Sequence, residues 1–201
     1  MDTEPPTLLA IEHCEPNLSP WLTLEYTHAA NVWSHHTIFT HVTKPTTTKT
    51  LHNLGDVTTA KANDYFKGKN CLILDPKAST PLAPKDFNNL DAIIIGGILG
   101  FKTPRGRTKK LISDHSTFAT RHIGPIQLTI DGAAVVAKAI QLGMPLKDIE
   151  IAYEVEVTHD DVHTTILPFG YPVFEGHPII TPGLIDYLTN NESATKKKPT
   201  S

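Results

Sequence analysis

The chain has 201 residues, of which 39% are hydrophobic and 19% charged, and its formal net charge at pH 7 is −3. This length and apolar content predict one compact domain with a core of its own. The acidic balance disfavours a protein that binds nucleic acid mainly through phosphates, because such proteins usually carry an excess of Lys and Arg. The longest apolar run, Ala92 to Phe101, is well short of the about 20 residues that a membrane span needs. We therefore expect no contact with a membrane.

The two cysteines, Cys14 and Cys71, lie far apart and lack C-x-x-C spacing, which predicts neither a zinc ribbon nor a redox dithiol. Free thiols are typical of a reducing compartment. Met1 to Pro6 has no basic region followed by an apolar one, as a signal peptide would. These features together favour a cytoplasmic location.

The first two thirds of the chain alternate short apolar runs with amphipathic segments. A helix is predicted from Pro20 to about Trp33, with Ser19 as its N-cap. Thr43 to Lys61 is polar and predicts a loop or a short helix, and Lys85 to Leu90 predicts one or two helical turns. Buried strands are predicted at Leu8 to Ile11, Thr37 to Val42, Cys71 to Leu74, Ala92 to Ile95 and Thr117 to His122.

The last third begins with the clearest helix, Thr129 to Leu142, which Gly143 ends. Ile151 to Val157 alternates apolar and polar residues and predicts a half-buried strand. Leu167 to Pro182 is rich in Pro, Gly and aromatic residues, and a short helix is predicted from Gly183 to Leu188. We expect one domain over residues 1–190 and a disordered basic tail over residues 191–201.

Strands that interleave with helices, each nearly continuous in apolar residues, are typical of an α/β fold with a mostly parallel sheet and helices on both faces. In such sheets, ligands bind in the crevice at the carboxyl ends of the strands. The segments that directly follow the strands are therefore where chemistry is expected.

Three such segments stand out, and two of them combine glycines with apolar and polar residues. Glycines allow a backbone to approach a flat ligand without a Cβ in the way. Neither G-x-G-x-x-G nor G-x-x-x-x-G-K-[ST] is present, so dinucleotide and nucleoside triphosphate sites have no support. The segments are Leu74-Asp75-Pro76, then Gly96-Gly97-Ile98-Leu99-Gly100 with Pro104-Arg105-Gly106-Arg107-Thr108, and finally His122-Ile123-Gly124 with Gln127-Leu128-Thr129 and Asp131.

Taken with Ile11-Glu12-His13, Glu15-Pro16, Trp21 and Leu24-Glu25-Tyr26, these segments resemble the SPOUT methyltransferases. The closer resemblance is to the eukaryotic SPOUT-type protein-arginine methyltransferases, which modify a small-subunit ribosomal protein. It covers most of Leu8 to Ala139, and Ile94 to Thr108 is its most specific part. Ile130-Asp131-Gly132-Ala133 departs from the family's Thr-Asp-Thr-Ala, and the segment after Asp148 matches weakly.

The resemblance implies a C-terminal trefoil knot and S-adenosylmethionine (SAM) as cofactor. It also implies a small-subunit ribosomal protein as substrate and a monomer, with a dimer not excluded and an RNA contact left open. The implied cofactor residues are Leu74, Asp75, Pro76, Gly96, Gly97, Ile98, Leu99, Gly100, His122, Ile123, Gly124, Gln127, Leu128, Thr129 and Asp131. Asp131 has a second interpretation as the cap of the helix that follows it.

Arginine is a poor nucleophile because its guanidinium is protonated, and carboxylates can orient it and help it to lose a proton. Glu12 ends the first predicted strand and is expected to point into the crevice, and Glu25 lies on the following helix. The alternative for Glu25 is a solvated helix face. Arg105 is the third candidate and, like Arg107, fits the cofactor's carboxylate, an RNA phosphate or a surface ion pair.

Two other classes of function stay open at this stage. Most SPOUT relatives act on RNA, so an RNA methyltransferase is the nearest alternative, and a non-catalytic module that binds the cofactor is a third. His159 and His163 have the i, i+4 spacing of a metal pair on a helix, but their surroundings alternate as in a strand. We therefore expect no metal site.

Overall fold

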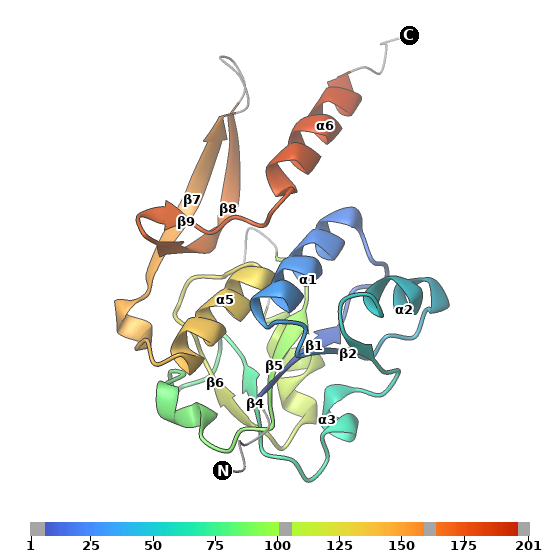
Figure 1. The fold of residues 1–201 in the computed structure, drawn as a ribbon, viewed down its shortest axis with the longest axis vertical. Helices are drawn as coiled ribbons and strands as arrows, with labels where there is room; N and C mark the ends of the chain where they lie inside the picture. Colours follow the sequence, from blue (N-terminus) through green and yellow to red (C-terminus); the bar gives the residue numbers. More distant parts are fainter. Residues whose placement is uncertain (1–6, 101–105, 159–163, 197–201) are drawn as a thin grey trace.

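The computed structural model describes residues 7–100, 106–158 and 164–196. Its centre is a six-stranded sheet of order β3-β2-β1-β5-β4-β6, in which every neighbouring pair is parallel (Figure 1). The α/β class with a mostly parallel sheet is thereby confirmed. The strands are β1 (Leu8–His13), β2 (Thr37–Thr40), β3 (Asp56–Val57), β4 (Cys71–Leu74), β5 (Ala92–Gly97) and β6 (Ala119–Arg121).

Helices cover both faces of this sheet, as the sequence predicts. Successive strand residues point to opposite faces. On one face, Leu9 and Ile11 pack in a core with the helices α1 (Pro20–Val32) and α5 (Ile130–Gln141). On the other face, Ala10 packs in a smaller core with α3 (Ala62–Tyr65) and with Ile112, which follows α4 (Arg107–Leu111).

The caps of the two long helices come from hydroxyl side chains. Ser19 accepts a hydrogen bond from Leu22 N, and Pro20 is the first residue of α1, as predicted. Thr129 accepts one from Gly132 N and is the N-cap of α5. The expectation that Asp131 caps this helix is therefore wrong, because α5 begins one residue before it.

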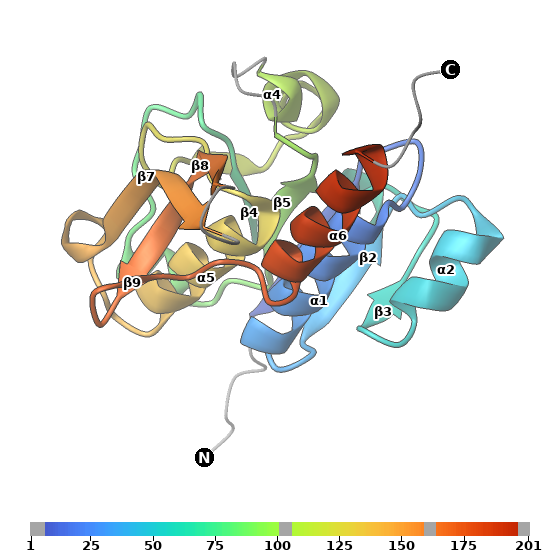
Figure 2. The same cartoon turned by 90° about the horizontal axis from the view of Figure 1, so that it is seen from above.

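A three-stranded antiparallel sheet and a last helix form one end of the molecule (Figure 1). The sheet comprises β7 (Glu150–Thr158), β8 (Thr164–Phe174) and β9 (His177–Pro178), and the helix is α6 (Leu184–Lys196). Strand β8 contacts α5, and α6 lies beside α1 (Figure 2). This part of the chain therefore packs on the same two helices that cover one face of the parallel sheet.

The structure differs from the predicted elements mainly in the C-terminal part of the chain, after β7. Strands β8 and β9 fall in the segment for which no element was predicted, and α6 continues to Lys196, past its predicted end at Leu188. In the polar segment Thr43 to Lys61, the helix α2 (Pro45–Leu51) agrees with the predicted short helix, whereas β3 was not predicted. Short 3₁₀ helices lie at Pro84–Phe87, Ser113–His115 and Leu146–Asp148. Among the described residues, no helix is long and apolar enough to cross a membrane.

Candidate active site

The three strand-end segments meet around one cavity of about 240 Å³ at the carboxyl ends of β4, β5 and β6. Of the residues predicted to hold the cofactor, all except Gly97, His122 and Asp131 line it. The walls also include Arg107, which was considered for the cofactor's carboxylate, and eight further residues that are neighbours in the same segments. These eight are Lys77, Ile95, Gly106, Thr108, Pro125, Ile126, Ile130 and Ala133.

Asp75 fixes the shape of the first segment. Its side chain is buried, and it accepts hydrogen bonds from Lys77 N at 2.8 Å and from Ser113 Oγ at 2.6 Å. Both carboxylate oxygens are therefore occupied by the protein itself. Asp75 therefore holds the loop, with each oxygen bound to a group of the protein.

The second segment depends on a glycine that packs closely. A Cβ on Gly100 would overlap the side-chain Nε2 of Gln127 and lie 2.5 Å from Cε1 of Phe169. Gly100 therefore lets the second segment, the third segment and strand β8 pack together without a gap. Strand β8 also holds the third segment, because Gly170 N on β8 donates a hydrogen bond to the carbonyl of Gln127 at 2.8 Å.

The three predicted residues outside the cavity lining have other contacts. Gly97 faces α1, where an added Cβ would overlap the hydroxyl of Tyr26. His122 accepts a hydrogen bond from Gly124 N through Nδ1 at 3.1 Å and so helps to shape the third segment. Asp131 lies behind the cavity, as described below.

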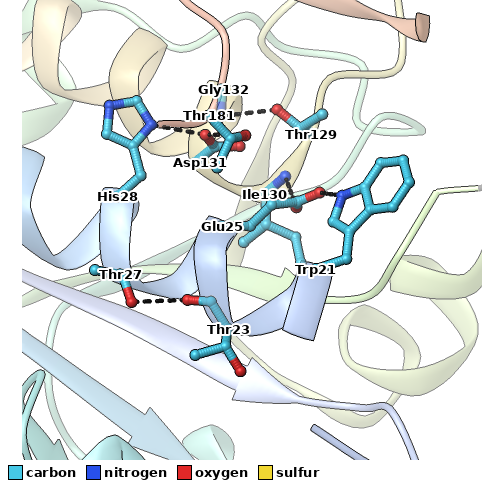
Figure 3. Close-up of polar contacts among 10 residues, drawn as sticks. All are labelled: Trp21, Thr23, Glu25, Thr27, His28, Thr129, Ile130, Asp131, Gly132 and Thr181. Atoms are coloured by element: carbon cyan, nitrogen blue, oxygen red, sulfur yellow. Dashed lines mark hydrogen bonds and ion pairs between the residues drawn. The ribbon is translucent and has the colours of Figure 1, made fainter. Parts of the chain in front are cut away.

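Glu25 is buried, so its interpretation as a solvated residue on an exposed helix face is wrong. It accepts hydrogen bonds from Trp21 Nε1 at 2.6 Å and from Ile130 N at 2.9 Å (Figure 3). Burial, and then the nearby Asp131, raise the pKa of Glu25 to about 8. The carboxyl group thus joins α1 to the start of α5, where Ile130 forms part of the cavity wall.

Asp131 is also buried and connects three parts of the fold. Its Oδ2 lies 2.7 Å from His28 Nδ1 and accepts a hydrogen bond from Thr181 Oγ1 at 2.7 Å (Figure 3). The Oδ1 of Asp131 and the hydroxyl of Tyr171 have no hydrogen-bond partner in the described part of the chain. Burial raises the pKa of Tyr171, and the charges of Glu25 and Asp131 raise it further.

Glu12 does not point into the cavity, which corrects the expectation from its place at the end of β1. Its side chain is buried on the opposite face of the sheet, where it accepts hydrogen bonds from Ala62 N at 2.6 Å and Thr40 Oγ1 at 3.1 Å. It lines a separate hollow of about 210 Å³ beside α3 and Ile112. The physical reason is the alternation of side chains along β1, which puts Glu12 on the same face as Ala10.

Glu15 does reach the cavity region. Its Oε1 accepts hydrogen bonds from Arg107 Nη1 at 2.8 Å and from Leu99 N at 3.0 Å. Leu99 and Arg107 line the cavity, so this carboxylate connects the two ends of the second segment. Arg105, His159 and His163 lie outside the described residues. Within the described residues, no group of His, Cys, Asp and Glu could hold a metal ion.

Comparisons with known proteins identify the family of this chain. A family model described as protein arginine N-methyltransferase SFM1-like matches residues 8–195. The chain is 32% identical over 202 residues to protein arginine N-methyltransferase SFM1 of Saccharomyces cerevisiae, which covers 91% of this chain and 94% of the yeast protein. The chain belongs to the SFM1-like family of protein arginine N-methyltransferases.

Solved structures show the same relationship. The crystal structure of the yeast arginine methyltransferase SFM1 complexed with SAM matches with a TM-score of 0.85 and 28% identity, covering 94% of this chain and 93% of that one. The dual-specific Trm10 of Thermococcus kodakaraensis matches with a TM-score of 0.57 and 18% identity, covering 71% of this chain and 96% of that one. At that identity the second likeness shows the fold alone.

Membership of this family decides between the classes left open by the sequence. The prediction of a methyltransferase of the protein-arginine type is confirmed at the level of the family. The SPOUT-type fold is supported by the same neighbours.

Proposed function

We propose that this protein transfers a methyl group from SAM to a guanidinium nitrogen of an arginine in a small-subunit ribosomal protein. The observation that carries the proposal is the convergence of the three strand-end segments on one cavity. The family membership and the SAM, SAH and MTA complexes of yeast SFM1 support the choice of cofactor. The ribosomal target is supported by the resemblance described under Sequence analysis.

The residues around the cavity fit SAM. Leu74, Ile95, Leu99, Leu128 and Ile130 provide apolar walls of the kind that an adenine ring needs. Gly100 lets the second and third segments approach each other, as its close contact with Gln127 shows. Among the described residues, the cationic side chains that line the cavity, Lys77 and Arg107, are suited to the methionine carboxylate.

When bound, the cofactor would supply an electrophilic methyl group on a sulfonium. In the transfer, the arginine nitrogen would bond to the methyl carbon and lose a proton. The electron pair of the broken carbon–sulfur bond would stay on sulfur. The protein's part is largely to position the reactants. Glu25 contributes to this by holding Ile130 and Trp21, and we assign it a positioning role. Arg105 is proposed as a further contact for the cofactor or substrate on the resemblance alone, and Glu12 is not proposed as catalytic.

We also propose that the chain is a monomer with a SPOUT knot and that it acts in the cytoplasm. The knot and the monomer follow from the resemblance, and the free thiols Cys14 and Cys71 are consistent with a reducing compartment. Sedimentation equilibrium tests the assembly state. A single species at the monomer mass supports the proposal, and a dimer refutes it.

The test of the activity uses labelled SAM and small ribosomal subunits from cells that lack this enzyme. After the reaction, protein and RNA are separated and counted, and labelled protein is hydrolysed to identify methylarginine. Label in one ribosomal protein, as methylarginine, is the expected result. Label in RNA alone would refute the proposal, as would the absence of label from enzyme that binds SAM in a separate titration.

A further inference from the structure

A carboxylate that already holds a guanidinium lies beside the cofactor cavity. The Oε1 of Glu15 lies 2.8 Å from Arg107 Nη1. Arg107 and Leu99, the two residues that Glu15 contacts, are both part of the cavity wall. The side chain of Glu15 is 15% exposed, and that of Arg107 is 26% exposed. The pair is therefore accessible from solvent, although most of its surface is shielded from water.

Glu15 has room for a further N–H donor. Both of its contacts fall on Oε1, and Oε2 accepts no hydrogen bond from the described residues. A carboxylate can accept several N–H bonds, and its pairs with guanidinium are often bidentate. Partial shielding from water strengthens such a pair relative to one on an open surface.

Among the described residues, the other carboxylates around the site hold parts of the fold together or point elsewhere. Glu25 and Asp75 each use both oxygens to hold the protein's own N–H and O–H groups. Glu12 lies on the opposite face of the sheet. Glu15 is thus the carboxylate whose geometry suits an incoming cation.

We propose that Glu15 binds the guanidinium of the target arginine and that Arg107 stays bound to Glu15 until the cofactor binds. This inference rests on the proposed function and identifies the residue that selects arginine. The cofactor's carboxylate is a second partner for Arg107, since that side chain lines the cofactor cavity. When Arg107 turns to the cofactor, Oε1 of Glu15 gains room beside the open Oε2, which permits a bidentate contact with the target guanidinium, so the protein substrate binds after the cofactor.

The test compares Glu15→Gln, Arg107→Ala and the matched control Glu150→Gln, which changes an exposed residue on β7. Glutamine keeps an oxygen for Leu99 N but removes the charge. The affinity for S-adenosylhomocysteine is measured by calorimetry, and kcat and KM are measured on unmethylated small subunits at saturating SAM. The control keeps the wild-type values.

For Glu15→Gln we expect cofactor affinity within about threefold of wild type and a fall of about 100-fold in kcat/KM for the protein substrate, the scale of a lost hydrogen bond to a charged group. For Arg107→Ala we expect cofactor affinity to fall about tenfold, with a smaller loss of kcat/KM for the protein substrate at saturating SAM than in Glu15→Gln.

Two results would overturn the inference. One is a Glu15→Gln enzyme with nearly wild-type kcat/KM, because the target guanidinium would then bind elsewhere. The other is an equal loss of kcat/KM in both variants at saturating SAM, because the pair would then be a structural ion pair. Failure of the proposed function has a different signature, since the wild-type enzyme itself would then methylate no protein.

Discussion

Replacing Glu25 with glutamine should remove much of the pH dependence of stability between about pH 5 and 8. The pKa of Glu25 is raised from 4.5 to about 8, first by burial and then by Asp131, against the hydrogen bonds from Ile130 and Trp21. In the unfolded chain the carboxyl returns to its ordinary pKa. Between the two values the folded protein binds more protons than the unfolded one, so its stability falls as the pH rises.

The size of this effect follows from linkage. A fully linked proton changes the free energy of unfolding by about 1.4 kcal/mol per pH unit. From about pH 5.5 to 7.5, wild type should therefore lose about 2–3 kcal/mol more than Glu25→Gln, in which the neutral side chain cannot titrate. Urea unfolding at three pH values measures the difference. The exposed variant Glu150→Gln should keep the wild-type slope, and equal slopes for wild type and Glu25→Gln would refute the reasoning.

Three further substitutions test the packing around the site. Gly97→Ala places a Cβ on the Tyr26 hydroxyl and should lower the free energy of unfolding by about 1–3 kcal/mol in urea titrations; an unchanged midpoint would mean that Tyr26 moves freely. Thr129→Ala removes the acceptor for Gly132 N and should cost about 1 kcal/mol, most of which Thr129→Ser should restore if the cap is responsible. Glu12→Ala leaves the N–H of Ala62 without its acceptor and should cost about 1–3 kcal/mol while cofactor affinity by calorimetry is retained; a loss of affinity with normal stability would place Glu12 in the site after all.

The parallel sheet could be predicted because its strands are short, nearly continuous apolar runs. The predicted bounds of β4 are those observed, and β5 begins where predicted. Strand β8 could not be recognised in the same way, because Pro168, Gly170 and Pro172 interrupt its pattern. Its place depends on long-range contacts, such as the hydrogen bond from Gly170 to the third segment. No local pattern in the sequence contains that information.

The position of the site could also be predicted, because the carboxyl ends of parallel strands meet at one edge of the sheet. Which side chains face the cavity was harder to infer. Gly97 ends β5 beside Gly96, yet it faces Tyr26 on α1. Asp131 is the last residue of the third segment, but α5 has already begun there, so its side chain turns toward His28 and Thr181. These outcomes depend on helix packing, which a single sequence does not specify.

The carboxylates after β1 show the same limit and also suggest where substrate contacts arise. Within β1 the alternation of side chains is strict, so Glu12 shares the face of Ala10 and is used to hold the start of α3. Glu15 comes two residues after the end of β1, where this constraint no longer applies, and its side chain turns to the second segment. A residue at a strand end is fixed by the sheet, whereas one just beyond it can follow the loop toward a ligand. For that reason, the carboxylate that we propose to receive the target arginine comes from the loop after β1 rather than from the strand itself.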